Sequence, residues 1–421
     1  MSTVVSPVEP AGVAERFRAV RRRTMELVQP LTAEDMMVQS SSETSPAKWH
    51  LAHTSWFFES FILREFLPGY RVFNTDFAWL FNSYYQTFAA FPEKRLRASF
   101  SRPGLEEVLR FREHVDAGIG RLLERNTPIE AIKLIELGAN HEEQHQELLL
   151  TDILHAFFTN PLRPTYLAAG NEQLCEQDAA PLEFVEYPGG LRDIGHSSDG
   201  FCFDNELPRH KVWLNPYTLA TRLITCGEFL DFIADSGYKR PELWLSAGWD
   251  AAQVNGWTAP LYWTNRDGNW SRVTLRGELP VTQTDACPVS HVSFFEADAF
   301  ARWAGRRLST ESEWEAAVGT QPIGGNLLDS GRLTTAPLAT DRGAQFFGDC
   351  WEWTASAYLG YPGYKPLPGS LGEYNGKFMS GQMVLRGGSC VTPAAHIRAS
   401  YRNFFSPATR WQFSGIRLAG L

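Results

Sequence analysis

The feature that most constrains the fold is a change of sequence character near residue 160. Before this point, apolar residues recur at the 3.6-residue spacing of amphipathic helices. After residue 182, short apolar runs alternate with Gly, Asn, Asp and Pro, and 160–182 carries three prolines typical of a linker. The sequence therefore predicts two modules of different class, at residues 1–165 and 180–421, within the two or three domains that 421 residues allow.

The first module is expected to be a bundle of four helices. A Ser-Pro pair begins a helix over 47–66 and a Thr-Pro pair begins one over 129–158, since proline is favoured in a first turn. Helices over 13–28 and from 103 to about 124 complete an antiparallel bundle. The connection at 68–100 is long and rich in aromatic residues, which indicates a functional loop.

The second module is expected to be an α+β domain with short strands and long loops. Helical patterns stand out over 226–236, 294–305 and 311–318, and most of the 14 tryptophans lie in this half. Aromatic residues in such number suit a rigid, turn-rich core or an aromatic-lined pocket.

Composition excludes several classes of function. A net charge of −9 argues against non-specific nucleic-acid binding, which needs a basic surface. No apolar run approaches the ~18 residues of a membrane span, and the N-terminus lacks the pattern of a signal peptide. Six cysteines without a CxxC pair do not form a disulfide framework, so we expect a cytoplasmic protein.

Two histidine clusters fall on separate expected helices, as W-H-L-A-H at 49–53 and H-E-E-Q-H at 141–145. Because residues i and i+4 share a helix face, His141 and His145 can hold one metal ion. His50 and His53 lie three residues apart on the other helix, and either can supply a third ligand. His155 lies almost three turns beyond His145 and is too far away for the same ion.

Three neutral imidazoles leave metal positions open for dioxygen and a substrate, which suits iron(II), although these residues alone do not choose iron over zinc. The second cluster also matches the H-E-x-x-H string of zinc proteases, in which Glu142 would be the base. The sequence then continues with Gln146 and Glu147, without the further ligand of the extended protease motif.

Longer stretches resemble a known pair of modules. Residues 45–59 and 141–153 resemble the DinB-type bundle that opens the ergothioneine sulfoxide synthases, the EgtB family. Six later stretches resemble the formylglycine-generating, or sulfatase-modifying, domain: 205–210, 288–293, 305–315, 351–354, 386–389 and 415–417. The resemblance covers nearly the whole chain and implies a DinB-like four-helix bundle followed by a C-type-lectin-like domain.

The resemblance also implies a mononuclear iron(II) site. Its ligands would be His53, His141 and His145. Hercynine, the trimethylated betaine of histidine, would bind with its imidazole on the iron, in contact with Gln144. Its betaine end would be held by Asn403, Phe404 and Phe405. Aromatic faces are natural partners of a quaternary ammonium, which has no N–H to donate.

The second module is expected to be a scaffold rather than a formylglycine-generating enzyme. Those enzymes use a cysteine pair shortly after the Gly-Gly-Ser motif, where this chain has Thr392 and Ile397. Cys390 is adjacent to the motif but alone.

The family needs a proton donor near the metal. In one subgroup of the family, the donor is a tyrosine that follows the Trp-Glu-Trp-Thr motif. In another subgroup, it is a tyrosine of a Ser-Tyr-Tyr string in the long loop of the bundle. This chain has Ser83-Tyr84-Tyr85 and so resembles the second subgroup. A phenol of pKa ~10 can donate a proton to a reduced oxygen species, and either Tyr84 or Tyr85 can fill this role.

One departure from the pattern of the family concerns the molecule that donates the sulfur or selenium atom, the chalcogen donor. Members that use cysteine carry an Arg-His-Pro-Arg string after the tyrosine pair, which binds the donor carboxylate, whereas this chain has Phe91 and Lys94 in place of the arginines. Lysine does not reproduce the arginine fork, although Arg95 or Arg97 can compensate. Selenoneine synthases share this architecture but take selenium from a selenosugar, which a neutral aromatic wall would suit.

The sequence therefore predicts an enzyme that uses iron(II) and dioxygen to form a C–Se or C–S bond on hercynine. We favour a selenosugar donor, with cysteine or γ-glutamylcysteine as the alternative. A zinc protease and a non-catalytic lectin-like binding protein are the alternatives from other classes. No nucleic acid or membrane partner is expected.

Overall fold

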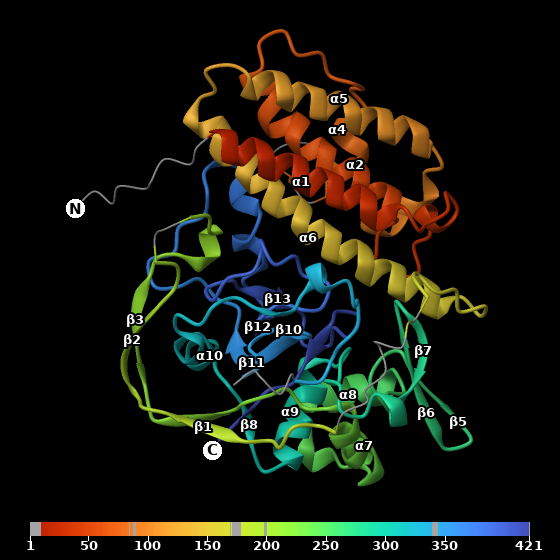
Figure 1. Ribbon diagram of the computed structural model, residues 1–421, viewed down its shortest axis with the longest axis vertical. Helices are drawn as coiled ribbons and strands as arrows, with labels where there is room; N and C mark the ends of the chain where they lie inside the picture. Colours follow the sequence, from red (N-terminus) through yellow and green to blue (C-terminus); the bar gives the residue numbers. More distant parts are fainter. Residues whose placement is uncertain are drawn as a thin grey trace. The chain divides into compact units, whose positions relative to one another are not determined.

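The computed structural model describes residues 10–83, 85–86, 90–168, 170, 178–197, 200–338 and 344–420 (Figure 1). The chain divides into two compact units. The first unit takes the described residues up to 162 together with 200–202 and 367–374, and the second takes the rest. The module limits expected from the sequence, 1–165 and 180–421, stay a prediction.

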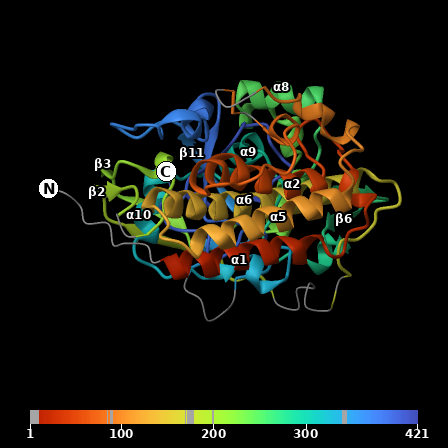
Figure 2. The ribbon, with the colours of Figure 1, turned by 90° about the horizontal axis from the view of Figure 1, so that it is seen from above.

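The first unit is a bundle of long helices, as predicted, and the helices run side by side in Figures 1 and 2. Its α-helices are α1 (Pro10–Val28), α2 (Ala47–Phe58), α3 (Arg64–Phe66), α4 (Phe77–Leu80), α5 (Leu105–Leu123) and α6 (Ile129–Thr159). A π-helical turn at Glu59–Leu63 joins α2 to α3, so the helix expected over 47–66 is continuous but contains this turn. The loop at 68–100 contains α4 and a 3-10 helix, Lys94–Ser99.

Helix α2 is the centre of the bundle. All of its residues are buried, and it packs against both α5 and α6, while α1 packs against α6. Gly138 on α6 permits the close approach of α2, because a Cβ atom there would lie 2.5 Å from Cε1 of Phe58. The histidine-bearing segments of α2 and α6 are thereby brought together in a water-poor interior.

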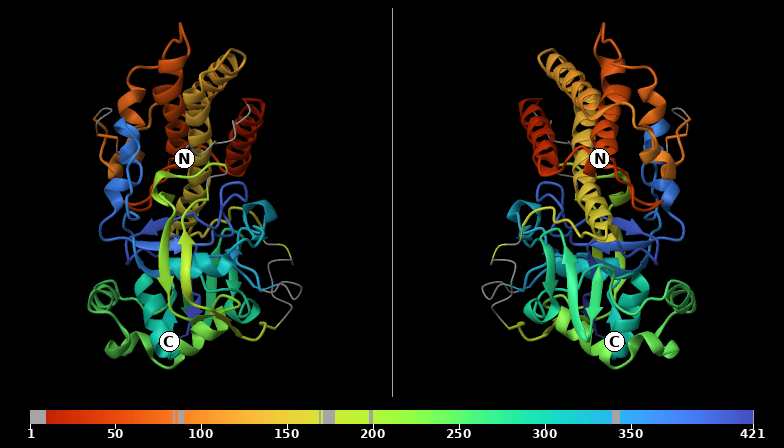
Figure 3. Two further views of the ribbon diagram at one scale, coloured as in Figure 1. Left: turned by 90° about the vertical axis from the view of Figure 1, so that its left-hand side faces the viewer. Right: turned by 90° about the vertical axis from the view of Figure 1, so that its right-hand side faces the viewer.

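The second unit is built from short strands arranged in several sheets (Figures 1 and 3). One four-stranded sheet has the order β1-β4-β15-β8, and another has the order β13-β12-β11-β14. Strands β5, β6 and β7 form a three-stranded meander, while β2 pairs with β3 and β9 with β10. The strands are β1 (Phe184–Tyr187), β2 (Gly190–Ile194), β3 (His210–Leu214), β4 (Tyr217–Ala220), β5 (Trp263–Arg266), β6 (Asn269–Thr274), β7 (Gly277–Pro280), β8 (Arg307–Leu308), β9 (Gly325–Asn326), β10 (Phe347–Gly348), β11 (Trp351–Ala357), β12 (Met383–Arg386), β13 (Asn403–Phe405), β14 (Ser414–Gly415) and β15 (Leu418–Ala419).

Its helices are α7 (Cys226–Ala234), α8 (Ser246–Val254), α9 (Phe294–Trp303) and α10 (Glu311–Val318). Capping boxes begin three of them, as in α10, where Thr310 caps the helix and Glu313 reaches back. Helix α8 was not predicted, because its nine residues lack a capping box and contain glycine. Among the described helices of the chain, none is both long and apolar enough to cross a membrane.

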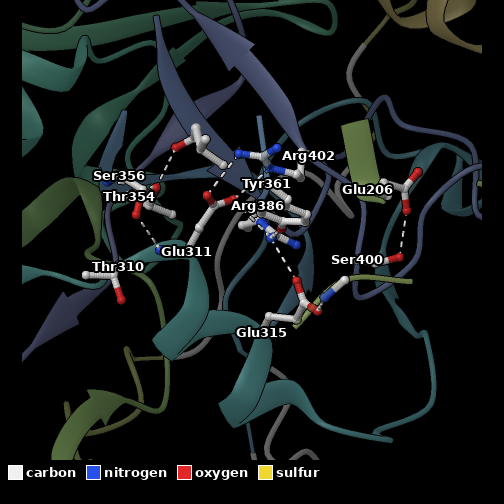
Figure 4. Close-up of polar contacts among 12 residues, drawn as sticks. Glu206, Thr310, Glu311, Glu315, Thr354, Ser356, Tyr361, Arg386, Ser400 and Arg402 are labelled. Carbon is white, nitrogen blue, oxygen red and sulfur yellow. Dashed lines mark hydrogen bonds and ion pairs between the residues drawn. The ribbon is translucent and has the colours of Figure 1, made fainter. Parts of the chain in front are cut away.

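A buried ion cluster connects α10 to the strands of the second unit (Figure 4). The guanidinium of Arg386 on β12 donates to Glu311 and Glu315, and Arg402 donates two hydrogen bonds to Glu311. Each carboxylate is therefore paired, as burial of a charge requires. The cluster gives Arg386, Glu311 and Glu315, which lie in two of the stretches that resemble the formylglycine-generating domain, a structural role in this unit.

Candidate metal centre

Three histidines meet inside the first unit. His53 lies on α2, and His141 and His145 lie one turn apart on α6, with one ring nitrogen from each within 4.8 Å of the others. In the part of the chain that the structure describes, this is the one group of three or more such side chains found so close together. The spacing of four residues on α6 brings the rings of His141 and His145 together, and their role as metal ligands stays a prediction.

The ring nitrogens of this triad fit a metal ion. Nδ1 of His53 lies 2.5 Å from the carbonyl oxygen of Phe81, which leaves Nε2 for another partner. That Nε2 atom and both nitrogens of His141 are buried and have no hydrogen-bond partner among the described residues. Buried polar atoms without a partner are rare. A first-row divalent ion with imidazole ligands would satisfy Nε2 of His53 and one of the two nitrogens of His141.

Electrostatics keeps the three imidazoles neutral. Burial lowers the pKa of His141 to about 3. Burial, together with the neighbouring histidines, also holds the pKa of His53 and of His145 well below its usual value. At neutral pH each ring therefore has a lone pair that can bind a metal, and no proton has to be displaced.

Aromatic side chains enclose the triad. The rings of Trp49 and Trp56 lie nearly parallel to that of His53, with centroids 4.4 and 5.3 Å away. Phe57 contacts His141 at 4.7 Å between centroids. Such surroundings exclude water and restrict the orientation of the imidazole rings.

His50 is not a member of the triad. Its Nδ1 atom lies 2.8 Å from Nδ1 of His145, and its Nε2 atom lies 3.0 Å from Oδ2 of Asp152. Both nitrogens of His50 therefore have hydrogen-bond partners. Of His50 and His53, the two candidates for the third ligand, this favours His53. His155 points elsewhere, with Nδ1 2.6 Å from the hydroxyl of Ser40.

Of the two tyrosines expected as proton donors, the structure describes one. Tyr84 lies outside the described residues. Tyr85 is fully buried, and its ring contacts those of Trp56 and Phe61 at 5.6 and 5.2 Å. Since Trp56 in turn lies against His53, Tyr85 is one ring removed from the triad.

A third tyrosine was missed by the sequence analysis. The hydroxyl of Tyr374 donates to Oε1 of Gln144, and its ring lies 5.7 Å from that of His141. Glu373 beside it accepts a hydrogen bond from the backbone N–H of Gln86, 3.1 Å away. The signal was present, since Tyr374 follows the Trp-Glu-Trp-Thr motif, but several tyrosines do so and spacing alone does not choose among them.

Of the four side chains expected near the chalcogen donor, the structure brings one toward the triad. Lys94 pairs with Glu43 and Arg95 with Glu93, all of them exposed, and Phe91 is half-buried. Arg97 is buried, donates to the hydroxyl of Ser45, and lies 3.5 Å above the ring centroid of Trp49. The residues expected at the betaine end, Asn403, Phe404 and Phe405, form β13 of the second unit, where Phe404 stacks on Tyr358.

Comparisons with known proteins agree with this two-part architecture. Residues 16–149 match the DinB superfamily. Residues 171–333 and 343–420 match the sulfatase-modifying factor enzyme 1-like domain. The predicted pair of modules is therefore confirmed.

Relatives match the chain along almost its full length. A protein of Mycolicibacterium smegmatis named hercynine oxygenase is 31% identical over 97% of this chain and 98% of its own length. The chain belongs to the hercynine oxygenase family. Another hercynine oxygenase, from Mycolicibacterium thermoresistibile, is 30% identical over 97% of this chain and 94% of its own. A Schizosaccharomyces pombe protein named ergothioneine biosynthesis protein 1 is 28% identical over 52% of this chain and 27% of its own.

Membership of the hercynine oxygenase family makes the chain an enzyme, so the alternative of a non-catalytic lectin-like binding protein is wrong. The zinc-protease alternative does not fit the geometry either. Both carboxylate oxygens of Glu142 are taken, one by Arg21 and the other by Arg112 and Thr24. The two guanidiniums outweigh burial and lower the pKa of Glu142 to about 2, so this residue is not available as a base.

Proposed function

We propose that this enzyme uses iron(II) and dioxygen to join a sulfur or selenium atom to the imidazole ring of hercynine. The observation that carries the proposal is the triad of His53, His141 and His145, whose ring nitrogens lie within 4.8 Å of one another, with the first two residues buried and the third partly exposed. The full-length similarity to proteins named hercynine oxygenase supports hercynine as the substrate.

The reaction balances with dioxygen as the oxidant. For a donor R–XH, where X is sulfur or selenium, the C–H bond of the imidazole carbon between the two nitrogens and the X–H bond break, and a C–X bond forms. One oxygen atom is transferred to X, and the other leaves as water with the two hydrogens. When bound, iron(II) would supply open coordination positions and the electrons needed to activate dioxygen.

The protein's own contribution is to position the substrate and to exclude water from the reacting groups. Trp49, Trp56 and Phe57 surround the triad with apolar surface, which strengthens electrostatic interactions and keeps water from the reacting groups. Gln144, whose Oε1 accepts from Tyr374, would contact the substrate imidazole. Phe404 and Phe405 would face the trimethylammonium group, and Asn403 the betaine carboxylate.

A tyrosine would supply the proton that the reduced oxygen needs. Tyr374 lies against His141 and hydrogen-bonds Gln144, so it is our first candidate among the described residues. Tyr85 is the second, since one aromatic ring separates it from His53. Tyr84 stays a prediction from the sequence.

For the donor we favour a selenosugar. The positions of the two expected arginines hold Phe91 and Lys94, and the ammonium of Lys94 pairs with Glu43 at the surface. Arg95 is likewise paired with Glu93. A bidentate carboxylate clamp therefore has no support at these positions, and a neutral sugar needs none.

One observation favours the alternative donor, cysteine or γ-glutamylcysteine. The buried guanidinium of Arg97 has no hydrogen-bond partner at Nε among the described residues. It lines a small cavity with Lys48, Arg102 and Trp49. The cavity has a volume of about 20 Å³, room for about one water molecule, so these cationic side chains would have to move apart to bind a donor carboxylate.

The test is a comparison of donors. The protein would be reconstituted with iron(II) without oxygen, then given hercynine, dioxygen and either cysteine, γ-glutamylcysteine or a selenosugar. Mass spectrometry should show a selenium adduct of hercynine from the selenosugar. A sulfoxide from cysteine that is lost in Arg97→Met would establish the alternative donor, and no adduct from any donor would contradict the proposed function.

A further inference from the structure

We propose that Asp152 and His50 are positioning residues that fix the tautomer of His145, so that His145 presents Nε2 to the metal. The inference rests on the metal centre proposed above and adds two residues to it. Asp152 was not among the residues singled out from the sequence, and His50 was considered there as a ligand.

The three side chains form one hydrogen-bonded line between α2 and α6. Nε2 of His50 lies 3.0 Å from Oδ2 of Asp152, and Nδ1 of His50 lies 2.8 Å from Nδ1 of His145. His50 is 3% exposed and Asp152 is 8% exposed. Bulk water therefore hardly competes for the hydrogen bond between His50 and Asp152.

The direction of each hydrogen bond in this line follows from which groups can donate a proton. A carboxylate only accepts, so His50 donates its Nε2 proton to Asp152. A neutral His50 then has a lone pair at Nδ1, and His145 must donate from its own Nδ1. An imidazole with its proton on Nδ1 keeps the lone pair on Nε2, which is the atom left to bind a metal.

The carboxylate at the start of the line is itself held in place. The backbone N–H of Ser45, just before α2, donates to the same Oδ2 atom of Asp152 at 2.8 Å. The hydroxyl of Ser45 accepts from Nη1 of Arg97 at 2.7 Å. Asp152 is thus set in position by the protein before any ion arrives.

His53 shows the same principle with a different partner. Its Nδ1 faces the carbonyl oxygen of Phe81, a group that can only accept, so its proton is on Nδ1 and its lone pair on Nε2. Two of the three ligands are therefore held in the same tautomer, one by a backbone carbonyl and one by a carboxylate acting through His50. A carboxylate behind a ligating histidine also increases its basicity.

The same contacts give His50 a role other than that of a fourth ligand. Its two nitrogens are within hydrogen-bond distance of Asp152 and His145, so neither has a lone pair directed at the ion.

The experiment is a titration of the metal-free full-length chain with cobalt(II), which binds imidazole sites and reports them spectroscopically. Asp152→Leu and His50→Phe break the line, whereas Asp152→Asn keeps an oxygen that can accept from His50. His155→Phe is the matched control, a histidine of the same helix outside the line. His53→Ala tests the metal centre itself. Thermal unfolding identifies any variant that is not folded.

We expect Asp152→Leu and His50→Phe to lose about 10- to 100-fold in cobalt(II) affinity. Asp152→Asn should lose less, and His155→Phe should bind like the wild type. Proton NMR of the cobalt(II) protein adds a readout that a merely structural role would not move. The exchangeable, strongly shifted N–H signal of the bound His145 should be present in the wild type and Asp152→Asn and absent in the two disrupting variants.

Unchanged affinity and an unchanged N–H signal in both disrupting variants would overturn the role of Asp152 and His50 while leaving the metal centre intact. If the wild type itself takes up no stoichiometric cobalt(II), the metal centre fails, and the inference fails with it. If Asp152→Leu does not fold, the result for His50→Phe decides.

Discussion

Trp49 stacks on His53, with ring centroids 4.4 Å apart and ring planes 11° from parallel. The two residues lie one turn apart on α2, and the guanidinium of Arg97 lies 3.5 Å from the centroid of the Trp49 ring. A cation, an indole and an imidazole are therefore layered in the interior of the bundle. The indole fixes the plane of His53, and the carbonyl of Phe81 fixes its rotation.

Replacing the indole should loosen this arrangement. Trp49→Leu removes a cation–π contact and leaves a cavity, so we expect the free energy of unfolding to fall by about 2–4 kcal/mol. Iron(II) affinity should fall as well, because His53 loses its stacking partner. Denaturant unfolding and metal titration measure the two effects. Trp79→Leu is the control, since Trp79 is 42% exposed, and its stability should be nearly unchanged.

Glu142 should matter for stability rather than for proton transfer. It pairs with Arg21 and Arg112 in the interior, and Glu142→Gln would leave the buried Arg112 without its carboxylate partner and Arg21 with Asp116 alone. We expect a loss of about 3–5 kcal/mol in the free energy of unfolding. The neighbour Glu143 pairs with the partly exposed Arg16, so Glu143→Gln should cost less than Glu142→Gln. Equal stability of the two variants in urea would contradict this account.

The roles of Tyr374 and Tyr85 in proton transfer can be distinguished by removing the hydroxyl oxygen of one tyrosine at a time. If Tyr374 is the proton donor, Tyr374→Phe should lower the turnover rate by about 10²- to 10⁴-fold and leave iron(II) affinity unchanged. Tyr85→Phe should then keep most of the activity. Steady-state kinetics and product analysis on both variants check this. Full activity in Tyr374→Phe would move the assignment to Tyr85 or to Tyr84.

The metal-free protein should lose stability as the pH falls from 7 to 5. Burial holds the folded-state pKa of His53, His141 and His145 below the unfolded value of about 6.5. Below that pH the unfolded chain binds protons that the folded chain does not, so acid favours unfolding. Each histidine contributes up to about 1.4 kcal/mol per pH unit. Urea unfolding at a series of pH values measures the slope, and a flat profile over this range would contradict the burial of neutral imidazoles.

Much of the first unit could be predicted because its signals are local. Proline pairs and the 3.6-residue period located the helices at 47–66 and 129–158, and the i, i+4 spacing placed His141 and His145 on one face. The π-helical turn at Glu59–Leu63 leaves no such local signal. Glu59 at its start accepts hydrogen bonds from the hydroxyl of Tyr70 and the backbone N–H of Phe73, which lie beyond the helix in the sequence.

The parts that could not be predicted depend on contacts between distant segments. The choice of His53 over His50 follows from Asp152, about a hundred residues away. Tyr374 reaches Gln144 across an even longer separation in the chain. Arg97 is buried against Trp49 whereas Lys94 and Arg95 are exposed, a difference that no residue pattern encodes.

The central claim is that iron(II) held by His53, His141 and His145 is needed to modify hercynine. The most direct measurement is product formation by iron(II)-loaded wild type and His53→Ala in the presence of hercynine, dioxygen and the chalcogen donors, with bound iron quantified in the same samples. We predict one iron per wild-type chain with a hercynine adduct detected by mass spectrometry, and loss of both in His53→Ala. Full product formation by His53→Ala, or a wild type that modifies hercynine without bound iron, would contradict the account.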